Sequence, residues 1–513
     1  MADEPAGHLP RPSRLGAALL VSAFVVATCG LIYELLAGTL ASYLLGDSVT
    51  QFSTVIGSYL AAMGIGSWLS RYIGRGLATR FVIVELLVGL VGGFSSTILF
   101  AAFAYTSAFR LVLYVVVVIV GVLVGLEIPL LMRILKDRFN FRDVVAHVLT
   151  FDYLGALGAS LLFPLVLVPH LGLVRSALLF GLINAGVALW TTELLKSTLR
   201  ARGFLQASAV GVIVALGAGW IWSDRILEIG ETNLYADDVV LAKTTPYQRI
   251  VLTAWKDDLR LFLNSHLQFS SKDEYRYHEA LVHPGLSAQP NARRVLVLGG
   301  GDGLAVREIL KHPGLETITL VDLDPAMTHL FSTHPELRRL NHDAFLDPRV
   351  HVVNADAFVW LETSPTELYD FAVVDFPDPS TYSIGKLYTT AFYAALRRHL
   401  VPEGRFVVQS TSPLFARKSF WCVVQTVEAT GLTAAPYHVY VPAFGEWGFV
   451  IGGRSPFALP TALPGDLKFL TIAGLPELFT FPPDMARVPV EPNRLNTQVL
   501  VKYYEQEWDG INR

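Results

Sequence analysis

The sequence predicts a protein of two unlike parts: an α-helical transmembrane bundle of about seven helices, then a small β-rich lobe with a Rossmann-like α/β domain. Hydrophobic residues make up 52% of the 513 residues and charged residues only 16%, whereas soluble domains carry about 25% charged residues. The long apolar stretches lie before residue 223, and short strands alternate with helical segments from Arg294 onward. Part of the chain is therefore expected to lie in lipid.

The amino-terminal part contains about seven apolar segments that approach the roughly 20 residues needed to span a bilayer. They are Leu15–Leu36, Phe52–Leu69, Phe81–Ala104, Leu111–Leu131, Val144–Val168, Leu171–Leu194 and Phe204–Trp222. A cleaved signal peptide is the alternative for the first segment, but its apolar run is long and continues past Ala37 without a clean cleavage context. We therefore predict a multi-pass transmembrane domain over residues 1–223.

Basic residues in the loops predict how this bundle is oriented. They gather on one side, at Arg11, Arg14, Arg71, Arg75, Arg80, Arg133, Lys136, Arg138, Arg142, Lys196, Arg200 and Arg202. Cytoplasmic loops carry an excess of Lys and Arg, so the amino terminus is expected in the cytoplasm. An odd number of helices then places the second part outside the cytoplasm, in a protein of the cell membrane.

After Asp224 the charged residues return and the apolar runs shorten. We predict a β-rich lobe over residues 224–290, with strands at Val239–Ala242, Ile250–Trp255 and Leu259–Leu263. A Rossmann-like domain follows over residues 291–455, in which strands of a parallel sheet alternate with helices. Its strands are Val295–Leu298, Thr317–Val321, Val350–Val353, Phe371–Val374 and Phe406–Gln409, with antiparallel edge strands over Ala435–Ile451. Residues 456–513 form a C-terminal extension.

A glycine-rich turn, Gly299-Gly-Gly-Asp302-Gly303, follows the first parallel strand. Such a turn lets the backbone approach a nucleotide closely. Roughly 20 residues further on, Asp322 ends the next strand, where an acidic residue can hydrogen-bond a ribose diol; the alternative is that it caps the next helix. Asp356 follows the third strand, placed either to accept from an adenine amino group or to cap a helix.

Two acids, Asp375 and Asp378, follow the fourth strand at the carboxyl edge of the sheet, where ligands of α/β proteins bind. Neighbouring carboxylates repel each other and raise the pKa of one another, and a cationic ligand removes that cost. Together with Asp302, these acids predict a pocket suited to amines.

Other classes of ligand are disfavoured by the composition. The net charge of −4 argues against a nucleic-acid partner. The two cysteines, Cys29 and Cys422, provide neither a disulfide framework nor a metal-ligand spacing. We therefore expect no metal and no nucleic acid at the site.

Several further motifs follow one another in a fixed order. They are Tyr247-Gln248, Leu261–Gln268, Asp273–Glu279, Gly299–Gly303, Asp347–Val350, Asp375–Asp378, Leu387-Tyr388, Phe392-Tyr393 and Gln409-Ser410. This order resembles the spermidine synthases (polyamine aminopropyltransferases), and among them the members with amino-terminal transmembrane helices. The resemblance covers about Thr232 to Gly452. It implies a methyltransferase-type Rossmann-like domain and aminopropyl transfer from decarboxylated S-adenosylmethionine to an amine, by default putrescine, and it suggests a homodimer.

The resemblance also implies roles at the amine end of the site. Asp375 would be the base that takes a proton from the attacking amine. Asp375 and Asp378 would hold the amine chain, and Tyr277 would shape its path. His278 and Asp302 would contact the aminopropyl and polyamine nitrogens.

At the nucleotide end, the resemblance implies that Gln248, Asp302, Asp322, Asp356 and Ala357 bind the cosubstrate. Decarboxylated S-adenosylmethionine is consumed as a cosubstrate, so no metal or prosthetic cofactor is implied.

This chain departs from the family's pattern at several positions. Leu304 replaces the final glycine of the turn, and Ala357 replaces a glycine. Phe376-Pro377 replaces small hydroxyl residues, and Phe444 stands where the family has an aromatic hydroxyl at the substrate amine. These changes affect the acceptor more than the cosubstrate, so putrescine is only the default acceptor.

Two other functions compete with aminopropyl transfer. One is another transferase, such as a methyltransferase that uses ordinary S-adenosylmethionine, although the methionine carboxylate would face Asp302 unfavourably. The other is a membrane polyamine-binding or transport protein with a non-catalytic synthase-like domain. The extracytoplasmic position supports it, because the nucleotide cosubstrate is scarce there.

Acidic side chains also lie within or near the predicted spans, at Glu34, Glu85, Glu127 and Asp152, with His147 one turn before Asp152. An ionisable group near the middle of a bilayer costs about 2.5–3.5 kcal/mol and usually faces a polar interior or a partner. One interpretation places Glu85 and His147 at the membrane interface and pairs the other acids with hydroxyls. The other has Glu34, Glu127 and Asp152 line a path for a polyamine.

Overall fold

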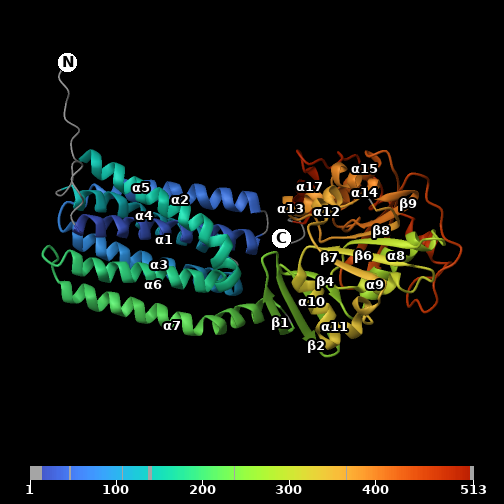
Figure 1. The fold of residues 1–513 in the computed structure, drawn as a ribbon, viewed down its shortest axis with the longest axis horizontal. Helices are drawn as coiled ribbons and strands as arrows, with labels where there is room; N and C mark the ends of the chain where they lie inside the picture. The colour runs from blue at the N-terminus through green and yellow to red at the C-terminus, as the bar shows by residue number, and fades with distance from the viewer. Residues whose placement is uncertain are drawn as a thin grey trace, which may run out of the picture. The chain divides into compact units, whose positions relative to one another are not determined.

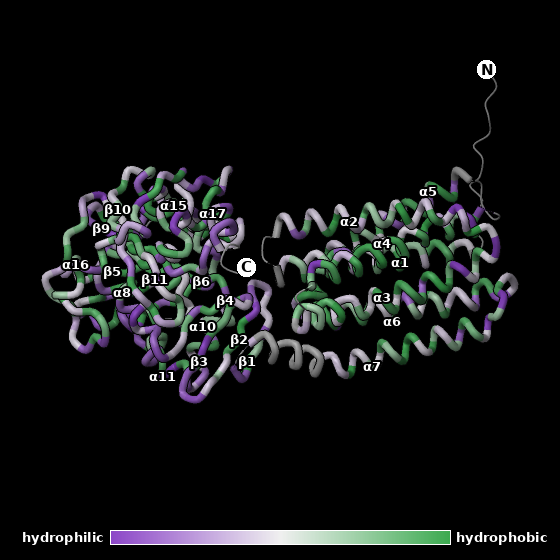
Figure 2. Tube along the Cα trace, turned by 180° about the vertical axis from the view of Figure 1, so that it is seen from behind, coloured by the Kyte–Doolittle hydropathy of each residue, from purple (hydrophilic) through white to green (hydrophobic). Residues whose placement is uncertain are grey.

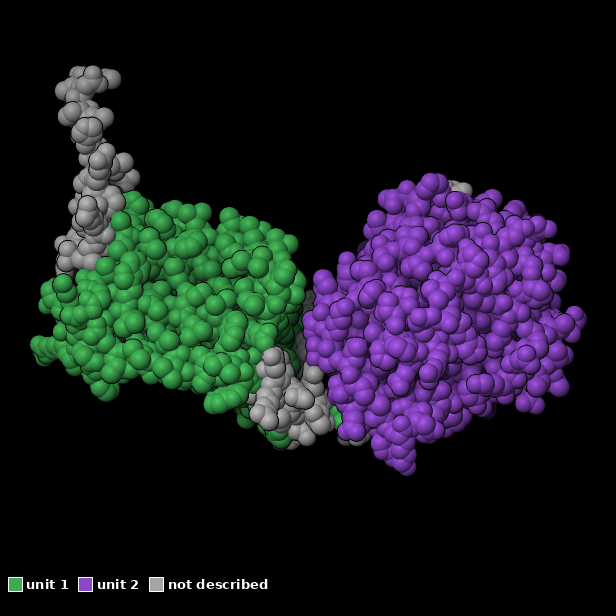
Figure 3. All heavy atoms as spheres, turned by 60° about the horizontal axis from the view of Figure 1, so that its bottom comes forward, with its two compact units in different colours: residues 1–236 green, residues 237–513 purple. Residues whose placement is uncertain are grey.

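The structure, a computed structural model, describes residues 14–45, 48–106, 108–136, 141–235, 237–365 and 367–508. Of the basic loop residues, Arg11 and Arg138 lie outside the described residues. The chain forms two compact units, residues 1–236 and residues 237–513 (Figure 3). Each unit has its own core.

The first unit is a bundle of long helices (Figure 1). Their bounds are α1 Arg14–Leu45, α2 Ser48–Ser70, α3 Leu77–Tyr105, α4 Phe109–Leu135, α5 Phe141–Leu162, α6 Val168–Leu194 and α7 Arg202–Leu234, with a π-helical turn Phe163–Leu167 between α5 and α6. Hydrophobic residues dominate these helices, whereas hydrophilic and hydrophobic residues are mixed along the second unit (Figure 2). Six of the predicted apolar segments each lie within one of these helices, and Val144–Val168 runs from α5 through the π-helical turn to the first residue of α6.

Six helical runs in the described part are long and apolar enough to cross a membrane, and one of them, Asp143–Leu194, is 52 residues long. At 1.5 Å per residue such a run would measure about 78 Å, more than twice the roughly 30 Å of a hydrocarbon core. Gly172 interrupts it with non-helical angles (φ 70°, ψ −178°). The run therefore contains two segments of membrane-spanning length, as the sequence predicts.

Glycines set how closely α2 and α4 pack. A Cβ atom on Gly66 would lie 2.1 Å from the carbonyl oxygen of Val122, and one on Gly125 would lie 2.2 Å from that of Met63. These distances leave no room for a side chain, so the two helix backbones are in direct contact. Small residues commonly permit such contacts in membrane helices.

The second unit begins with a four-stranded antiparallel sheet in the order β1-β2-β3-β4. Its strands are β1 Asp238–Thr244, β2 Arg249–Trp255, β3 Asp258–Leu263 and β4 His266–Ser270. Strand β4 was not predicted, because its hairpin turn uses Asn264 (φ 50°) and Ser265 (φ 68°) in place of the Asn-Gly pair that usually marks such a turn.

The second sheet has seven strands in the order β10-β11-β9-β8-β5-β6-β7. Its strands are β5 Arg294–Gly299, β6 Thr317–Asp322, β7 Val350–Asn354, β8 Tyr369–Asp375, β9 Leu400–Gln409, β10 Thr433–Val441 and β11 Gly445–Gly453. The strands β5 to β9 pair in parallel, and β10 and β11 form the antiparallel edge. The predicted parallel strands are confirmed, and the strand order reverses between β5 and β8.

Helices cover both faces of this sheet, because successive residues of a strand face opposite sides. Val295 and Val297 pack in one hydrophobic cluster, and Leu296 and Leu298 pack in the other. The helices are α8 Glu274–Ser287, α9 Leu304–Ile309, α10 Pro325–Thr333, α11 Pro335–Leu340, α12 Ala357–Thr363, α13 Tyr382–Gly385, α14 Thr390–Arg398, α15 Arg417–Glu428, α16 Leu475–Leu478 and α17 Val499–Trp508.

Residues 456–508 wrap around the α/β domain and are tied to it by buried hydrogen bonds. Asn493 is fully buried, and its side-chain amide donates to the carbonyl oxygens of Gly385 (3.0 Å) and Tyr388 (3.1 Å). On α17, the Glu507 carboxylate accepts from the backbone N–H groups of Lys418 (2.7 Å) and Ser419 (3.0 Å) at the start of α15. The extension therefore holds α17 against the carboxyl end of the parallel strands.

Candidate active site

The turn after β5 lies directly against the end of β8. Gly299 pairs with Asp375 in the register of the two strands, and the Gly300 N–H donates to the carbonyl oxygen of Asp375 (3.2 Å). A Cβ atom on Gly299, whose φ is 82°, would come 2.2 Å from that oxygen. The turn therefore requires glycine, and it lies where the strand order reverses, which is where doubly wound sheets bind ligands.

Asp375 ends β8, and its side chain is held by a tyrosine from α8. The Tyr277 hydroxyl donates to Asp375 Oδ1 (2.7 Å). The pKa of Asp375 is raised to about 6, chiefly by burial and also by the charge of Asp302, whereas the charge of His278 and the Tyr277 hydrogen bond oppose the rise. An aspartate with this pKa is ionised at neutral pH and is a stronger base than an ordinary aspartate.

Asp378 lies three residues further on and is held by donors from two distant segments. Oδ1 accepts from Gln409 Nε2 (3.3 Å) at the end of β9, and Oδ2 accepts from the hydroxyls of Thr411 (3.1 Å) and Tyr504 (3.1 Å). Burial raises the pKa of Asp378 to about 6, and these hydrogen bonds oppose the rise. The two acids thus have different supports, one from α8 and one from β9 and α17.

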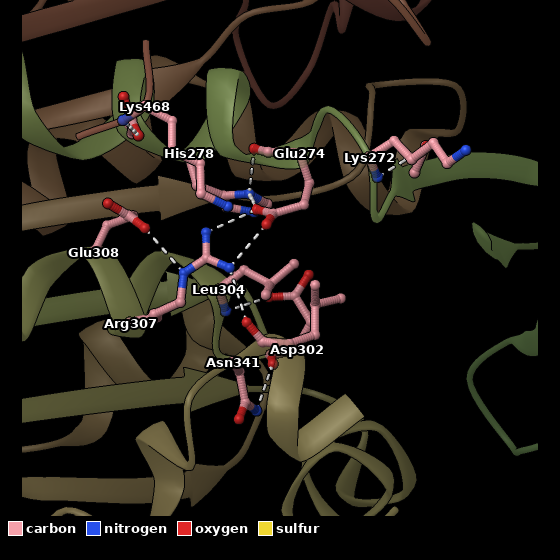
Figure 4. Close-up of polar contacts among 12 residues, drawn as sticks. Lys272, Glu274, His278, Asp302, Leu304, Arg307, Glu308, Asn341 and Lys468 are labelled. Carbon is pink, nitrogen blue, oxygen red and sulfur yellow. Dashed lines mark hydrogen bonds and ion pairs between the residues drawn. The ribbon is translucent and has the colours of Figure 1, made fainter. Parts of the chain in front are cut away.

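Asp302, in the glycine turn, stands beside a buried network of charged residues (Figure 4). The His278 Nδ1 atom lies 2.8 Å from Glu274 Oε2, and Arg307 donates to both oxygens of Glu274 (2.8 and 2.9 Å). Burial by itself would lower the pKa of His278, but the hydrogen bond and the charge of Glu274 raise this pKa. Burial raises the pKa of Asp302, and the positive charge of His278 opposes that rise. A protonated His278 therefore favours the ionised forms of Asp302 and Asp375.

Asp322, at the end of β6, is bound to the glycine turn. Its Oδ2 accepts from the Gly301 N–H (3.1 Å), and its Oδ1 accepts from the Asp324 N–H (2.9 Å). Asp324, and not Asp322, caps α10, since its side chain accepts from the Ala326 N–H. Burial raises the pKa of Asp322 to about 6. The helix-cap alternative for Asp322 is therefore wrong.

Gln248 reaches the same edge from the antiparallel sheet. Its side-chain amide donates to Asp324 Oδ2 (3.0 Å), which also accepts from the Thr245 hydroxyl (2.8 Å). Gln248 thus joins the four-stranded sheet to the α/β domain beside Asp322, and it contacts Asp324.

Asp356 and Ala357 lie at the start of α12. Asp356 caps this helix by accepting from the N–H groups of Phe358 (2.9 Å) and Val359 (3.2 Å), and Lys386 Nζ lies 2.6 Å from its Oδ2. Burial by itself would raise the pKa of Asp356, but the hydrogen bonds from Lys386 and from the backbone lower this pKa. The helix-cap alternative for Asp356 is confirmed, and its contact with an adenine stays a prediction.

Aromatic rings lie beside the residues that hold Asp375 and Asp378. Phe444 lies 6.3 Å from the ring of Tyr277 and 5.2 Å from that of Trp447, measured between centroids. The Trp447 Nε1 atom donates to Gln409 Oε1 (3.3 Å). This aromatic group is continuous with the residues that hold Asp375 and Asp378.

Three supporting residues were not predicted as site residues: Gln409, Thr411 and Tyr504. Gln409 ends a parallel strand, β9, at the same edge of the sheet as the predicted acids, so its place at the strand end was an available signal. Thr411 has a positive φ of 57°, which no local motif indicates. Tyr504 lies 126 positions after Asp378, and only the three-dimensional packing of α17 brings it to the site.

Carboxylates at the switch point of a doubly wound sheet define a ligand-binding α/β protein, and comparison with known proteins gives its family. The family profile described as "Spermine/spermidine synthase domain" matches residues 274–457. A "Polyamine aminopropyltransferase" of Leptospira interrogans is 53% identical over 96% of this chain and 99% of its own length. A "Polyamine aminopropyltransferase 1" of Ralstonia nicotianae is 57% identical over 98% of both chains. The chain therefore belongs to the polyamine aminopropyltransferase family, and relatives match it along the helical unit as well.

A crystal structure of spermidine synthase in complex with the transition-state analogue AdoDATO is also similar. It is 24% identical, covers 48% of this chain and 86% of that chain, and has a TM-score of 0.45. The family assignment rests on the full-length relatives. This family assignment supports aminopropyl transfer over another transferase activity and over a non-catalytic polyamine-binding or transport function, which the sequence leaves open.

Proposed function

We propose that this chain transfers an aminopropyl group from decarboxylated S-adenosylmethionine to an amine acceptor, by default putrescine, which gives spermidine and methylthioadenosine. The observation that carries the proposal is the placement of Asp375 against the glycine turn after β5, with Asp378 three residues further on. Both acids are ionised at neutral pH, since the pKa of each is about 6. Such an edge attracts a substrate with several ammonium groups.

The reaction forms a C–N bond and breaks a C–S bond. The acceptor nitrogen attacks the propyl carbon that is bonded to the sulfonium sulfur, and the C–S electrons pass to sulfur, which leaves as a neutral thioether. The proton of the attacking nitrogen passes to Asp375. Because the sulfonium carbon is already electrophilic, positioning and proton removal are the main contributions of the protein.

Asp378 holds the acceptor chain while Asp375 acts as the base. Thr411 and Tyr504 donate to one oxygen of Asp378, which leaves Oδ1, with its longer contact to Gln409 (3.3 Å), to receive an ammonium group. Tyr277 fixes the orientation of Asp375 by its hydrogen bond. Phe444 and Tyr277 provide the apolar surface for the methylene groups of the amine.

The nucleotide part of the cosubstrate binds at the ends of β5, β6 and β7. Asp322 receives the ribose hydroxyls beside the glycine turn, where a Cβ atom on Gly301 would lie 2.7 Å from the Asp322 carboxyl. Gln248 lies close by on the antiparallel sheet. Asp356 and Ala357 receive the adenine, whose amino group then competes with Lys386 for the Asp356 carboxylate.

Incubation of the full chain with cosubstrate labelled in the propyl group and a panel of amines tests the proposal. The label is expected in a polyamine product, with one methylthioadenosine formed for each transfer. Transfer of a methyl group, or binding without turnover, would contradict it.

We further propose that α1 to α7 cross the cell membrane. Two arguments about sidedness disagree: the basic loops place the α/β domain outside the cytoplasm, whereas the supply of cosubstrate favours the cytoplasm. A topology reporter fused after Arg513 separates the two.

A further inference from the structure

Two glutamates in the helical unit are buried without any hydrogen-bonding partner. Glu85 on α3 has a relative exposure of 0% and Glu127 on α4 of 1%. None of their four carboxylate oxygens has a hydrogen bond within the described part of the chain. Neighbouring helices therefore enclose Glu85, whereas its depth in a membrane, at the interface or below it, stays a prediction.

The two carboxylates lie at the same depth. Glu85 comes eight residues after Leu77, where α3 begins, and Glu127 comes eight residues before Leu135, where α4 ends. Since the short α3–α4 connection makes these helices antiparallel, both side chains lie about 12 Å from the same end of the bundle. The charge of Glu85 acts on Glu127 across the helix interface.

Further polar groups without partners lie around this pair. The Tyr33 hydroxyl on α1 is buried and has no hydrogen bond within the described residues, and Tyr33 interacts electrostatically with both Glu85 and Glu127. Both amide atoms of Asn184 on α6 are buried and likewise unpaired. Asn184 packs against α3 at Gly89, one turn beyond Glu85, where a Cβ atom would lie 3.3 Å from Asn184 Cβ.

No cation in the described residues compensates these acids. The charges that act on Glu127 are those of Glu85 and of Asp152 on α5, and neither Glu85 nor Glu127 forms an ion pair with a described Lys, Arg or His. Unpaired buried acceptors cost free energy unless a donor or a proton satisfies them.

The chemistry of this group fits an ammonium ion. An alkylammonium carries one positive charge and three hydrogen-bond donors. The lining offers acceptors in the two carboxylates, the Asn184 amide carbonyl and the unpaired Tyr33 hydroxyl oxygen, and cations are also attracted to the aromatic ring of Tyr33. No group of three or more His, Cys, Asp or Glu with the geometry of a metal site occurs among the described residues. A diamine can place one ammonium group at each carboxylate.

We propose that Glu85, Glu127, Tyr33 and Asn184 form a binding site for a protonated amine inside the helical unit. The choice of a diamine as the ligand rests on the proposed function, whereas the cationic character of the ligand follows from the site itself. The protein then has two amine sites, one in each unit.

Equilibrium binding of labelled putrescine to the full chain in detergent tests this proposal. The parent protein is expected to bind two putrescines per chain, and Asp378→Asn is used to weaken the site in the α/β domain. In that background, Glu127→Gln and Glu85→Gln should each weaken the remaining site at least tenfold. Glu193→Gln is the matched control, since Glu193 is half exposed in the same unit and pairs with Arg202; it should leave binding unchanged.

Two further measurements keep the outcome interpretable. Tyr33→Phe removes only the unpaired hydroxyl and should weaken binding severalfold, which covers the case in which a glutamine variant does not fold. Aminopropyl transfer by Glu127→Gln should equal that of the parent. A single putrescine site per chain, or glutamine variants that bind as the parent does, would overturn the proposal while leaving the transferase activity intact. Loss of transfer in the parent would instead overturn the proposed function.

Discussion

The carboxylates of the α/β domain and those of the helical unit differ in whether other groups of the protein donate hydrogen bonds to them. Asp375 accepts from Tyr277, and Asp378 accepts from Gln409, Thr411 and Tyr504. In contrast, no described group donates to Glu85 or Glu127. Both sets are buried acids, but only the first is held in a fixed orientation by the protein.

Under the proposed function, this difference reflects that a catalytic carboxylate needs positioning as well as charge. A base must present its oxygen to one proton in one geometry, and supporting hydrogen bonds restrict its rotamers. A carboxylate that only binds a cation can instead orient on its ligand. The comparison predicts that substitutions in the α/β domain change rates, whereas those in the helical unit change binding alone.

The largest effect is expected from Asp375→Asn. The amide keeps the shape of the carboxylate but cannot accept the proton, and loss of a general base typically costs about 10²–10⁴-fold in rate. Turnover measured with labelled cosubstrate checks this, with methylthioadenosine binding retained. The matched control is Asp370→Asn at the other end of β8, where the carboxylate accepts from the backbone N–H groups of Arg293 and Arg294. Activity of Asp375→Asn within severalfold of the control would remove Asp375 from the mechanism.

A smaller effect is expected at Asp302, which should distinguish the two forms of the cosubstrate. Decarboxylated S-adenosylmethionine should bind more tightly than the carboxylated form, because a second carboxylate would face Asp302 at close range. In Asp302→Asn this preference should shrink about tenfold, as measured by calorimetry with both compounds. An unchanged preference would show that Asp302 does not select the cosubstrate.

The next effect concerns the hydrogen bond from Tyr504 that supports Asp378 and not Asp375. Tyr504→Phe removes a hydrogen bond that opposes the rise in the pKa of Asp378, so that pKa should increase. Asp378 then becomes protonated at a higher pH, and the acid limb of kcat/KM for the amine should move upward in pH, with KM raised severalfold at pH 7. Tyr503→Phe on the same helix is the control and should leave the pH profile unchanged. Identical profiles for the two variants would contradict a role for Tyr504.

Much of the fold could be predicted from the sequence because its signals are local. The apolar segments have the length of a bilayer, and the parallel strands are short apolar runs between helices. Strand β4 was missed because Asn264-Ser265 is a weak hairpin signal, and the burial of Glu85 was missed because a sequence does not show which face of a membrane helix meets another helix.

The candidate site was predictable to a similar degree. Asp302, Asp322, Asp375 and Asp378 lie at or just after the carboxyl ends of strands that must meet at one edge of a parallel sheet, so their proximity follows from topology. Tyr504 could not be predicted, since its place depends on how a segment of more than forty residues wraps around the domain before α17 begins.

The smallest effect is expected on the free energy of unfolding, which the burial of the Asp378 carboxylate lowers at neutral pH. Burial raises the pKa of Asp378 from 3.8 to about 6, so the folded protein holds this proton more tightly than the unfolded chain does. Stability therefore falls as pH rises from about 4 to about 6 and stays lower above that range. Asp378→Asn removes this penalty and should raise the unfolding midpoint of the α/β domain by about 6–12 °C at pH 7.5, on the basis of about 3 kcal/mol for a pKa raised from 3.8 to about 6 and the usual scaling for a large domain.

Below pH 4 the carboxyl is protonated in both states, so the midpoints of Asp378→Asn and the parent should converge. Thermal unfolding of the full chain in detergent, followed by tryptophan fluorescence, measures this, and Asp370→Asn should show no such gain at pH 7.5. Saturating putrescine should narrow the difference at pH 7.5, because a ligand that binds only the folded parent stabilises it by mass action. A parent that is as stable as Asp378→Asn at pH 7.5 without ligand would mean that the supporting donors fully compensate the burial of this carboxylate. The contrast with the unsupported glutamates of the helical unit would then be sharper still.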